Sequence, residues 1–242
     1  MNKDIENLQY LIDNAQHIVF FGGAGVSTES GIKDFRSKDG LYQLQSKYGR
    51  PYEEMLSHTY FMHDPDTFYQ FYKEFMINLD AKPNAAHKFL AELEKKKDVI
   101  VITQNIDGLH QIAGSKKVIE LHGSIHRNYC MYCQTFFGLD TIINSKGTPR
   151  CPHCDGIIKP DVVLYEEQLD AGVINDAIRA LEHADLLIVA GTSLSVYPAC
   201  GLIQYYGGRH IVVINKDHIS TNMDVDIEIN APVGETLKQI KI

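Results

Sequence analysis

Side chains that could bind and activate a small ligand are concentrated in residues 103–110, which read TQNIDGLH. They follow an apolar run, 99–102, that is typical of a strand buried on both faces. Open α/β sheets bind ligands at the carboxyl ends of their strands, so these amide and carboxylate groups would lie at a binding site. Asn105 and Asp107 are separated by a single residue, and an extended backbone would turn both side chains to one side. There they could hold a carboxamide or orient a water.

A histidine after a second apolar run is the best candidate for a general base. His122 follows the run 118–121 and precedes Gly123, which predicts an accessible imidazole that titrates near neutral pH. We expect the other histidines to be structural. The chain has no serine on a nucleophile elbow, and Cys200, expected to be a small buried residue at a helix start, has no obvious base. Covalent hydrolase chemistry is therefore not favoured.

Two glycine-containing turns could accept the phosphates and ribose of a nucleotide. Residues 23–25 (GAG) follow the apolar run 17–21, and a glycine turn before a helix lets backbone N–H groups approach phosphate. Thr28 stands where a dinucleotide fingerprint has its third glycine, so a plain tight turn is nearly as well supported. Residues 191–193 (GTS) form a second turn with hydroxyl donors, and Asn215 ends another apolar run. Several polar strand ends together predict a dinucleotide site.

Four of the five cysteines form two CxxC pairs with the spacing of a four-thiolate zinc site. The pairs are Cys130 with Cys133 and Cys151 with Cys154. Without a secretion signal, metal binding is favoured over disulfides, and two unrelated pairs are the least favoured interpretation. Because a four-cysteine set leaves no open position, we expect a structural zinc that clamps a short insert, with His153 as a bystander.

Composition narrows the class of protein and its partners. The chain has 242 residues, 44% hydrophobic and 22% charged, with a net charge of −8. This acidic balance gives no electrostatic basis for direct nucleic-acid binding. No apolar stretch approaches the ~20 residues of a membrane span, and the acidic, amphipathic start lacks the apolar region of a signal peptide. We expect a soluble cytoplasmic protein that does not bind membranes, with a monomer favoured.

Alternating helix and strand patterns predict an α/β fold with a doubly wound parallel sheet. The polar segment 33–50 is predicted to be a long loop, and the zinc insert to cover about 128–157. The apolar patterns predict helices over 5–15, 68–79, 84–93 and 174–181 and after Pro232, and strands over 17–21, 99–102, 118–121, 162–164, 186–190 and 211–214.

Together these motifs resemble the sirtuins, a family of NAD-dependent protein deacylases, from about residue 20 to the end. The resemblance rests on 23–27 (GAGVS), 30–36 (SGIKDFR), 103–110, 121–123 (LHG), the two cysteine pairs, 191–194 (GTSL) and Asn215. It implies a Rossmann-like NAD-binding domain and a smaller discontinuous domain made of a four-Cys zinc module and a helical insert. The implied boundaries are 1–36, 84–127 and 158–242 for the Rossmann-like domain, 37–83 for the lid loop and helical insert, and 128–157 for the zinc module.

The resemblance also implies a reaction in which NAD is consumed. Asn105, Ile106 and Asp107 would hold the nicotinamide end while the acyl oxygen of the substrate lysine attacks the ribose carbon. His122 would then take a proton from a ribose hydroxyl, leading to nicotinamide, free lysine and O-acyl-ADP-ribose. Phe35 would shield the reactive face from water.

Further contacts are implied by the same resemblance. Those to NAD are Gly23, Ala24, Gly25, Thr28, Arg36, Gln104, Gly191, Thr192, Ser193, Asn215 and Lys216. Those to an acyl-lysine protein or peptide are Val163, Leu164, Tyr165, Glu166 and Val196.

The chain departs from the family pattern at several positions. Lys33 replaces the usual proline before Asp-Phe-Arg, which should loosen the loop, and Gly22 stands where Thr or Ser is common. The peptide-pairing segment usually reads Phe-Gly-Glu, and here residues 165–167 read YEE. Since a substrate strand bonds backbone to backbone, Glu166 need not abolish binding, but its charge predicts a preference for basic flanking residues.

The sequence of the helical insert indicates which acyl group the protein removes. Family members that remove succinyl groups carry Tyr and Arg three residues apart. Here Tyr72 is present but Phe75 takes the place of the arginine. An apolar ring cannot pair with a carboxylate, so we expect acetyl, or a longer neutral acyl group, rather than succinyl.

Three other interpretations stay open at this point. An NAD-dependent ADP-ribosyltransferase would share these motifs and would transfer label from NAD to protein. A Rossmann dehydrogenase with a structural zinc needs an acidic ribose ligand about 20 residues after the glycines, where this chain has the polar loop. A zinc-ribbon binding module would lack NAD binding, and the polar strand ends argue against it.

Overall fold

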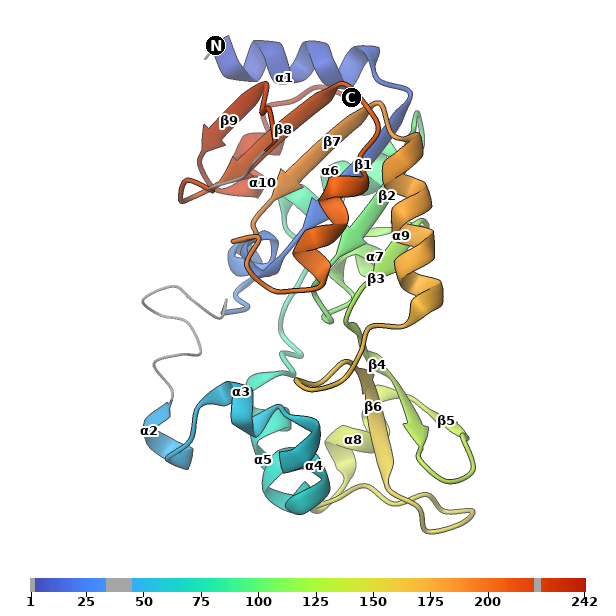
Figure 1. Ribbon diagram of the computed structural model, residues 1–242. Coiled ribbons are helices and arrows are strands. Elements are labelled where there is room, and N and C mark those ends of the chain that lie inside the picture. Colours follow the sequence, from blue (N-terminus) through green and yellow to red (C-terminus); the bar gives the residue numbers. More distant parts are fainter. Residues whose placement is uncertain (1–2, 34–44, 220–222) are drawn as a thin grey trace.

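The computed structural model describes residues 3–33, 45–219 and 223–242. Its main feature is a six-stranded parallel sheet with the strand order β3-β2-β1-β7-β8-β9 (Figure 1). This order places β1 between β2 and β7, where the direction of winding reverses and where doubly wound sheets bind ligands. The strands are β1 (His17–Gly22), β2 (Asp98–Thr103), β3 (Val118–Glu120), β7 (Leu186–Ala190), β8 (His210–Asn215) and β9 (Ile227–Asn230).

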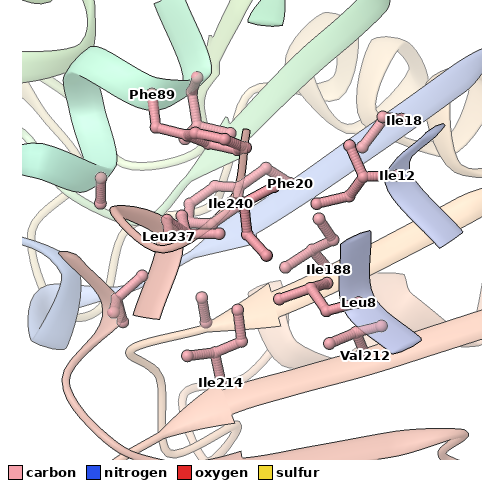
Figure 2. Packing of buried hydrophobic residues seen from close by; sticks show 14 of the residues in the cluster. Leu8, Ile12, Ile18, Phe20, Phe89, Ile188, Val212, Ile214, Leu237 and Ile240 are labelled. Carbon is pink, nitrogen blue, oxygen red and sulfur yellow. The ribbon is translucent and has the colours of Figure 1, made fainter. Parts of the chain in front are cut away.

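Helices cover both faces of this sheet because each inner strand is apolar on both sides. In β1, Ile18 and Phe20 contribute to one core and Val19 and Phe21 to the other, as the alternation of side chains along a strand requires. The first core lies under α1 (Lys3–Asn14), α6 (Ala85–Leu93) and α10 (Val233–Leu237), and Figure 2 shows part of its packing. The second lies under α9 (Ala171–His183) and the 3₁₀ segment η4 (Ala199–Tyr205). The predicted doubly wound sheet is confirmed.

A smaller body of structure, here called the small unit, lies beyond the carboxyl ends of the strands (Figure 1). Its antiparallel sheet has the order β5-β4-β6 and shares one apolar core with the helices of the insert. The strands are β4 (Gly123–Cys130), β5 (Phe136–Phe137) and β6 (Ile158–Val162). The helices are α2 (Gln45–Tyr48), α3 (Tyr52–Met55), α4 (His58–His63), α5 (Pro65–Phe75) and α8 (Leu139–Asn144).

Several expected element boundaries are wrong. Residues 162–164 do not resume the parallel sheet, because Val162 ends β6, which pairs with β4. The alternating burial of β6 and Pro160 within it are typical of an edge strand rather than a buried parallel one. The helix expected to reach 79 ends at Phe75, and Leu79 is 65% exposed.

Other elements were not expected from the sequence, β9 and α2 among them. Strand β9 is a short, half-buried edge strand, and helix α2 lies inside the segment predicted to be a loop. Residues 34–44 of that segment lie outside the described residues. None of the described helices is long and apolar enough to cross a membrane.

Candidate active site

A cavity of about 860 Å³ opens between the carboxyl ends of the parallel strands and the small unit. Most of the residues predicted to form the site line it. They are Ala24, Gly25, Thr28, Gln104, Asn105, Ile106, Asp107, His122, Val163, Leu164, Tyr165, Glu166, Gly191, Thr192, Ser193, Val196, Asn215 and Lys216. Gly23 lies outside the cavity lining, and Phe35 and Arg36 lie outside the described residues. Groups that are far apart in the sequence are thus brought together around one space.

His122 is held in a single orientation at this cavity. Its Nδ1 lies 2.8 Å from the backbone oxygen of Gln104, and since a carbonyl can only accept, Nδ1–H donates and Nε2 carries the lone pair. The side chain is half-buried rather than freely accessible as predicted. Burial lowers the pKa of the imidazole, opposed by the bond to Gln104, so the neutral form dominates at physiological pH. A neutral imidazole with a fixed tautomer is suited to accept a proton.

Asn105 and Asp107 converge on the hydroxyl of Ser27. Ser27 Oγ donates to Asp107 Oδ2 at 2.7 Å and accepts from Asn105 Nδ2 at 3.0 Å. The convergence predicted for these two residues is present, although the chain turns here instead of continuing as a strand. Sequence reasoning missed Ser27 as a site residue, even though it belongs to the glycine loop after β1.

The carboxylate of Asp107 is half-buried and lies among hydrogen-bond donors. Its Oδ1 accepts the backbone N–H of Leu109 at 2.9 Å, while Oδ2 accepts Ser27. Desolvation raises the pKa of Asp107, and these two hydrogen bonds act in the opposite direction. Both carboxylate oxygens are therefore fixed in position before any ligand binds.

The glycines of the two nucleotide-type turns let these turns pack against each other. Gly25 N–H donates to the Gly191 carbonyl at 2.7 Å, and a Cβ at Gly25 would lie 2.8 Å from Gly191 Cα. A Cβ at Gly23 would lie 2.8 Å from Thr192 Cβ. The expected helix after the first turn is wrong, because a 3₁₀ turn, η1 (Ala24–Val26), stands there. Close packing of the loops after β1 and β7 explains these glycines as directly as phosphate approach does.

The predicted substrate segment is anchored to the helical insert. Tyr165 N–H donates to Leu56 O at 3.0 Å, and Tyr165 O accepts from His58 N–H at 2.9 Å. Glu166 has a left-handed φ of 75°, and its Oε2 accepts Thr59 N–H and Thr59 Oγ1–H at 2.8 and 2.7 Å. The Thr59 hydroxyl and then its N–H lower the pKa of Glu166, so the carboxylate is ionised. Glu166 lines the cavity, so it adds a negative charge there.

The four cysteines of the CxxC pairs form a compact cluster whose sulfurs all lie within 4.8 Å of one another. Cys130 and Cys154 sulfurs are 3.4 Å apart, and those of Cys133 and Cys151 are 3.6 Å apart. Tetrahedral zinc with Zn–S bonds of about 2.3 Å requires sulfur separations of about 3.8 Å. The donor set thus fits a structural zinc, and the predicted ligands come together.

A buried histidine pair lies behind the site, between α6 and α7 (Leu109–Ala113). The rings of His87 and His110 are 4.6 Å apart, and neither ring nitrogen of His110 has a partner among the described residues. Desolvation lowers the pKa of His87 to about 4, and desolvation, followed by its neighbour, lowers that of His110 to about 3. His110 belongs to the 103–110 motif but lies outside the cavity lining, so its role is in packing.

Because both histidines of this pair are buried, we expect the folded protein to lose stability in acid. Each folded-state pKa lies below the unfolded value of 6.5, so protonation favours the unfolded chain and stability falls as the pH drops below about 6.5. The loss should be on the order of 1–2 kcal/mol per histidine by pH 5. Denaturant unfolding at pH 7 and pH 5 should show a smaller difference for His110→Leu than for the wild type. The exposed His183→Leu should keep the wild-type difference, and an unchanged difference in His110→Leu would contradict the prediction.

The fold and the cavity define a doubly wound α/β protein with a ligand site at the switch point of its sheet and a four-cysteine module beside it. The family model described as the Sir2 family matches residues 23–198. The chain belongs to the Sir2 family, as its sirtuin-like motifs predicted.

Relatives and solved structures match this chain over nearly its whole length. A protein named NAD-dependent protein deacetylase from Clostridium acetobutylicum is 52% identical, covering 98% of this chain and 97% of the relative. A Clostridium tetani protein of the same name is 55% identical, covering 96% and 95%. A solved Sir2 structure with a deacetylated p53 peptide and 3′-O-acetyl-ADP-ribose has a TM-score of 0.88 and 37% identity, and covers 97% of this chain and 96% of that one.

Proposed function

We propose that this chain is an NAD-dependent protein lysine deacetylase. It converts acetyl-lysine, NAD and water to lysine, nicotinamide and O-acetyl-ADP-ribose. The observation that carries this proposal is one cavity that presents both the neutral His122 imidazole and the Ser27–Asn105–Asp107 cluster. Relatives that match almost end to end and bear this name support it.

The roles that we propose for individual residues are those that the family resemblance implies. Asn105, Ile106 and Asp107 hold the nicotinamide end of NAD, and His122 takes the proton of a ribose hydroxyl after nicotinamide leaves. Phe35 excludes water from the reactive face. The rest of NAD contacts Gly23, Ala24, Gly25, Thr28, Arg36, Gln104, Gly191, Thr192, Ser193, Asn215 and Lys216. Zinc on the four cysteines supplies no chemistry and holds the module in shape.

Acyl-lysine peptides enter as an extended strand between two segments that line the cavity. Residues 163–166 offer one edge and Val196 belongs to the other.

The deacetylase acts as a cytoplasmic monomer. Its Rossmann-like domain comprises 1–36, 84–127 and 158–242, except that two strands at these boundaries, the start of β4 and the whole of β6, pair with each other in the small sheet. Residues 37–83 and 128–157 supply the helical insert and the zinc module.

Glu166 should favour basic residues around the substrate lysine. Its ionised carboxylate is exposed at the cavity rim, so peptides with Arg or Lys flanks should have kcat/KM a few-fold higher than acidic ones at low salt. Glu166→Gln should reduce this preference, and so should higher salt. The exposed Glu182→Gln on α9 is the matched control and should keep it. Equal rates for basic and acidic flanks in the wild type would refute the prediction.

Mass spectrometry of an acetyl-lysine peptide tests the function. With NAD, the peptide should lose its acetyl group and O-acetyl-ADP-ribose should appear, whereas without NAD neither should change. Cleavage of NAD with an intact acetyl peptide and label on a protein acceptor would instead establish ADP-ribosyl transfer. NAD left untouched would overturn the proposal.

A further inference from the structure

The loop that carries Asp107 contacts the first residues of β4 in the small unit. Ile125 N–H donates to the backbone oxygen of Ile106 at 3.0 Å. The next residue on β4 binds the next carbonyl of the loop, since His126 Nε2 lies 3.1 Å from the backbone oxygen of Asp107. A carbonyl can only accept, so Nε2 carries the proton and donates. Two consecutive carbonyls of the loop are thus bound from the small unit.

These two hydrogen bonds differ in what they require of the sequence. Every residue except proline would supply the backbone N–H at position 125, whereas the bond to Asp107 comes from a side chain. Within the part of the chain that the structure describes, no other donor bonds the Asp107 backbone oxygen. The residue at position 126 therefore decides whether this carbonyl has a protein partner.

The imidazole of His126 lies against Gly108, the residue that follows Asp107. A Cβ at position 108 would lie 2.6 Å from His126 Cδ2 and 2.8 Å from its Nε2, so glycine is what leaves room for the ring. Gly108 also has a left-handed φ of 71°. Glycine restrains its own backbone less than any other residue, so the peptide between residues 107 and 108 depends on outside contacts to stay fixed. His126 provides such a contact.

Asp107 is bound at three points by three segments of the chain. Its carboxylate accepts from Ser27 Oγ–H at 2.7 Å and from Leu109 N–H at 2.9 Å, and its backbone oxygen accepts from His126. The donors belong to the loop after β1, the start of α7 and β4. Loss of the third contact would let the peptide that carries the carboxylate shift. Displacements on the order of 1 Å in a positioned group are enough to weaken its action on a ligand.

We propose that His126 is a positioning residue for the nicotinamide end of NAD and acts through its hydrogen bond to the Asp107 backbone oxygen. This inference rests on the proposed function, in which Asp107 holds the nicotinamide end. His126 transfers no proton in this role, and His122 remains the base. What His126 contributes is a fixed place for the Asp107 carboxylate before NAD binds.

Two substitutions at position 126 separate the hydrogen bond from the bulk of the side chain. His126→Leu fills similar space without a donor, whereas His126→Gln keeps an amide N–H close to the place of Nε2–H. Because the side chain is exposed, neither change disturbs the apolar core. The full chain and both variants are assayed with NAD and an acetyl-lysine peptide, with and without added nicotinamide.

The effect should be confined to the nicotinamide end. In His126→Leu, the KM for NAD and the inhibition constant of nicotinamide should both rise about threefold to tenfold, as expected for one lost hydrogen bond. The KM for the peptide should not change, and His126→Gln should restore both constants. His183→Leu is the matched control, because exposed His183 also bonds a backbone carbonyl, that of Arg179, but does not line the cavity. It should leave all three constants unchanged.

Each other outcome counts against the inference. Wild-type constants in His126→Leu would remove it, while turnover of the acetyl peptide would leave the proposed function intact. A His126→Gln variant as impaired as His126→Leu would show that the imidazole itself is required and not the bond. An equal rise in the KM for the peptide, or the same changes in His183→Leu, would show a general loss of structure. A wild-type protein that leaves the acetyl peptide and NAD unchanged would overturn the proposed function together with the inference.

Discussion

The His122→Ala variant should lose deacetylation almost completely, with kcat/KM reduced about 10²- to 10⁴-fold. The reason is geometric, since Nδ1–H is fixed on the Gln104 carbonyl and only Nε2 is free to take the proton of the ribose hydroxyl. The measurement is the initial rate of O-acetyl-ADP-ribose formation from an acetyl-lysine peptide and NAD. Because burial lowers the pKa of His122, the acid limb of the wild-type pH profile of kcat/KM should lie below 6.5.

A second histidine provides the control for this variant. His183 is exposed on α9, where its Nδ1 lies 2.7 Å from the Arg179 carbonyl, and it does not line the cavity. The His183→Ala variant should therefore deacetylate the acetyl-lysine peptide at the wild-type rate. A His122→Ala enzyme that folds and retains more than about a tenth of the wild-type rate would remove His122 from the role of base.

The Cys130→Ser variant should lose bound zinc and, with it, the stability of the small unit. Cys130 belongs to the metal cluster and also to the apolar core shared by the insert helices and β4–β6. Loss of a structural metal from such a core should cost on the order of 5 kcal/mol. Zinc content measured by elemental mass spectrometry should fall from about one per chain to near zero. The unfolding temperature should drop with it, and a strong chelator should have the same effect on the wild type.

Cys200→Ser is the matched control for the zinc prediction. Cys200 is also buried, but it lies in η4 and is not part of the cluster. This variant should keep its full zinc content. If Cys130→Ser retained the metal as well, the cluster would not be the zinc site.

The parallel sheet could be predicted because its inner strands carry a strong local signal. Runs such as 99–102 and 186–190 are apolar throughout, as strands buried on both faces must be. Strand β9 and strand β6 lack that signal, since both lie at sheet edges and bury only alternate side chains. Which sheet β6 joins depends on its antiparallel pairing with β4, a long-range contact with no local trace in the sequence.

The active-site residues also divide into those with a local signal in the sequence and those without one. Asn105, Asp107 and His122 could be identified because they closely follow strand-like runs in the sequence, where parallel sheets place their ligand-binding groups. Ser27 could not, because its role depends on the loop after β1 meeting the loop after β2, and serine in a turn needs no explanation.

The shared core of the small unit determines when this protein can finish folding during synthesis. Tyr69 bonds to Ile158, 89 residues later, and Thr59 bonds to Glu166, 107 residues later. The aromatic side chains of α5 thus emerge from the ribosome long before the strands that cover them. Strand β7, the central neighbour of β1, is made later still. The core of the small unit ends at Leu164, whereas that of the large sheet extends to Ile240. The nascent chain therefore exposes its most aromatic helix until about two thirds of synthesis is over, and the large sheet is completed last.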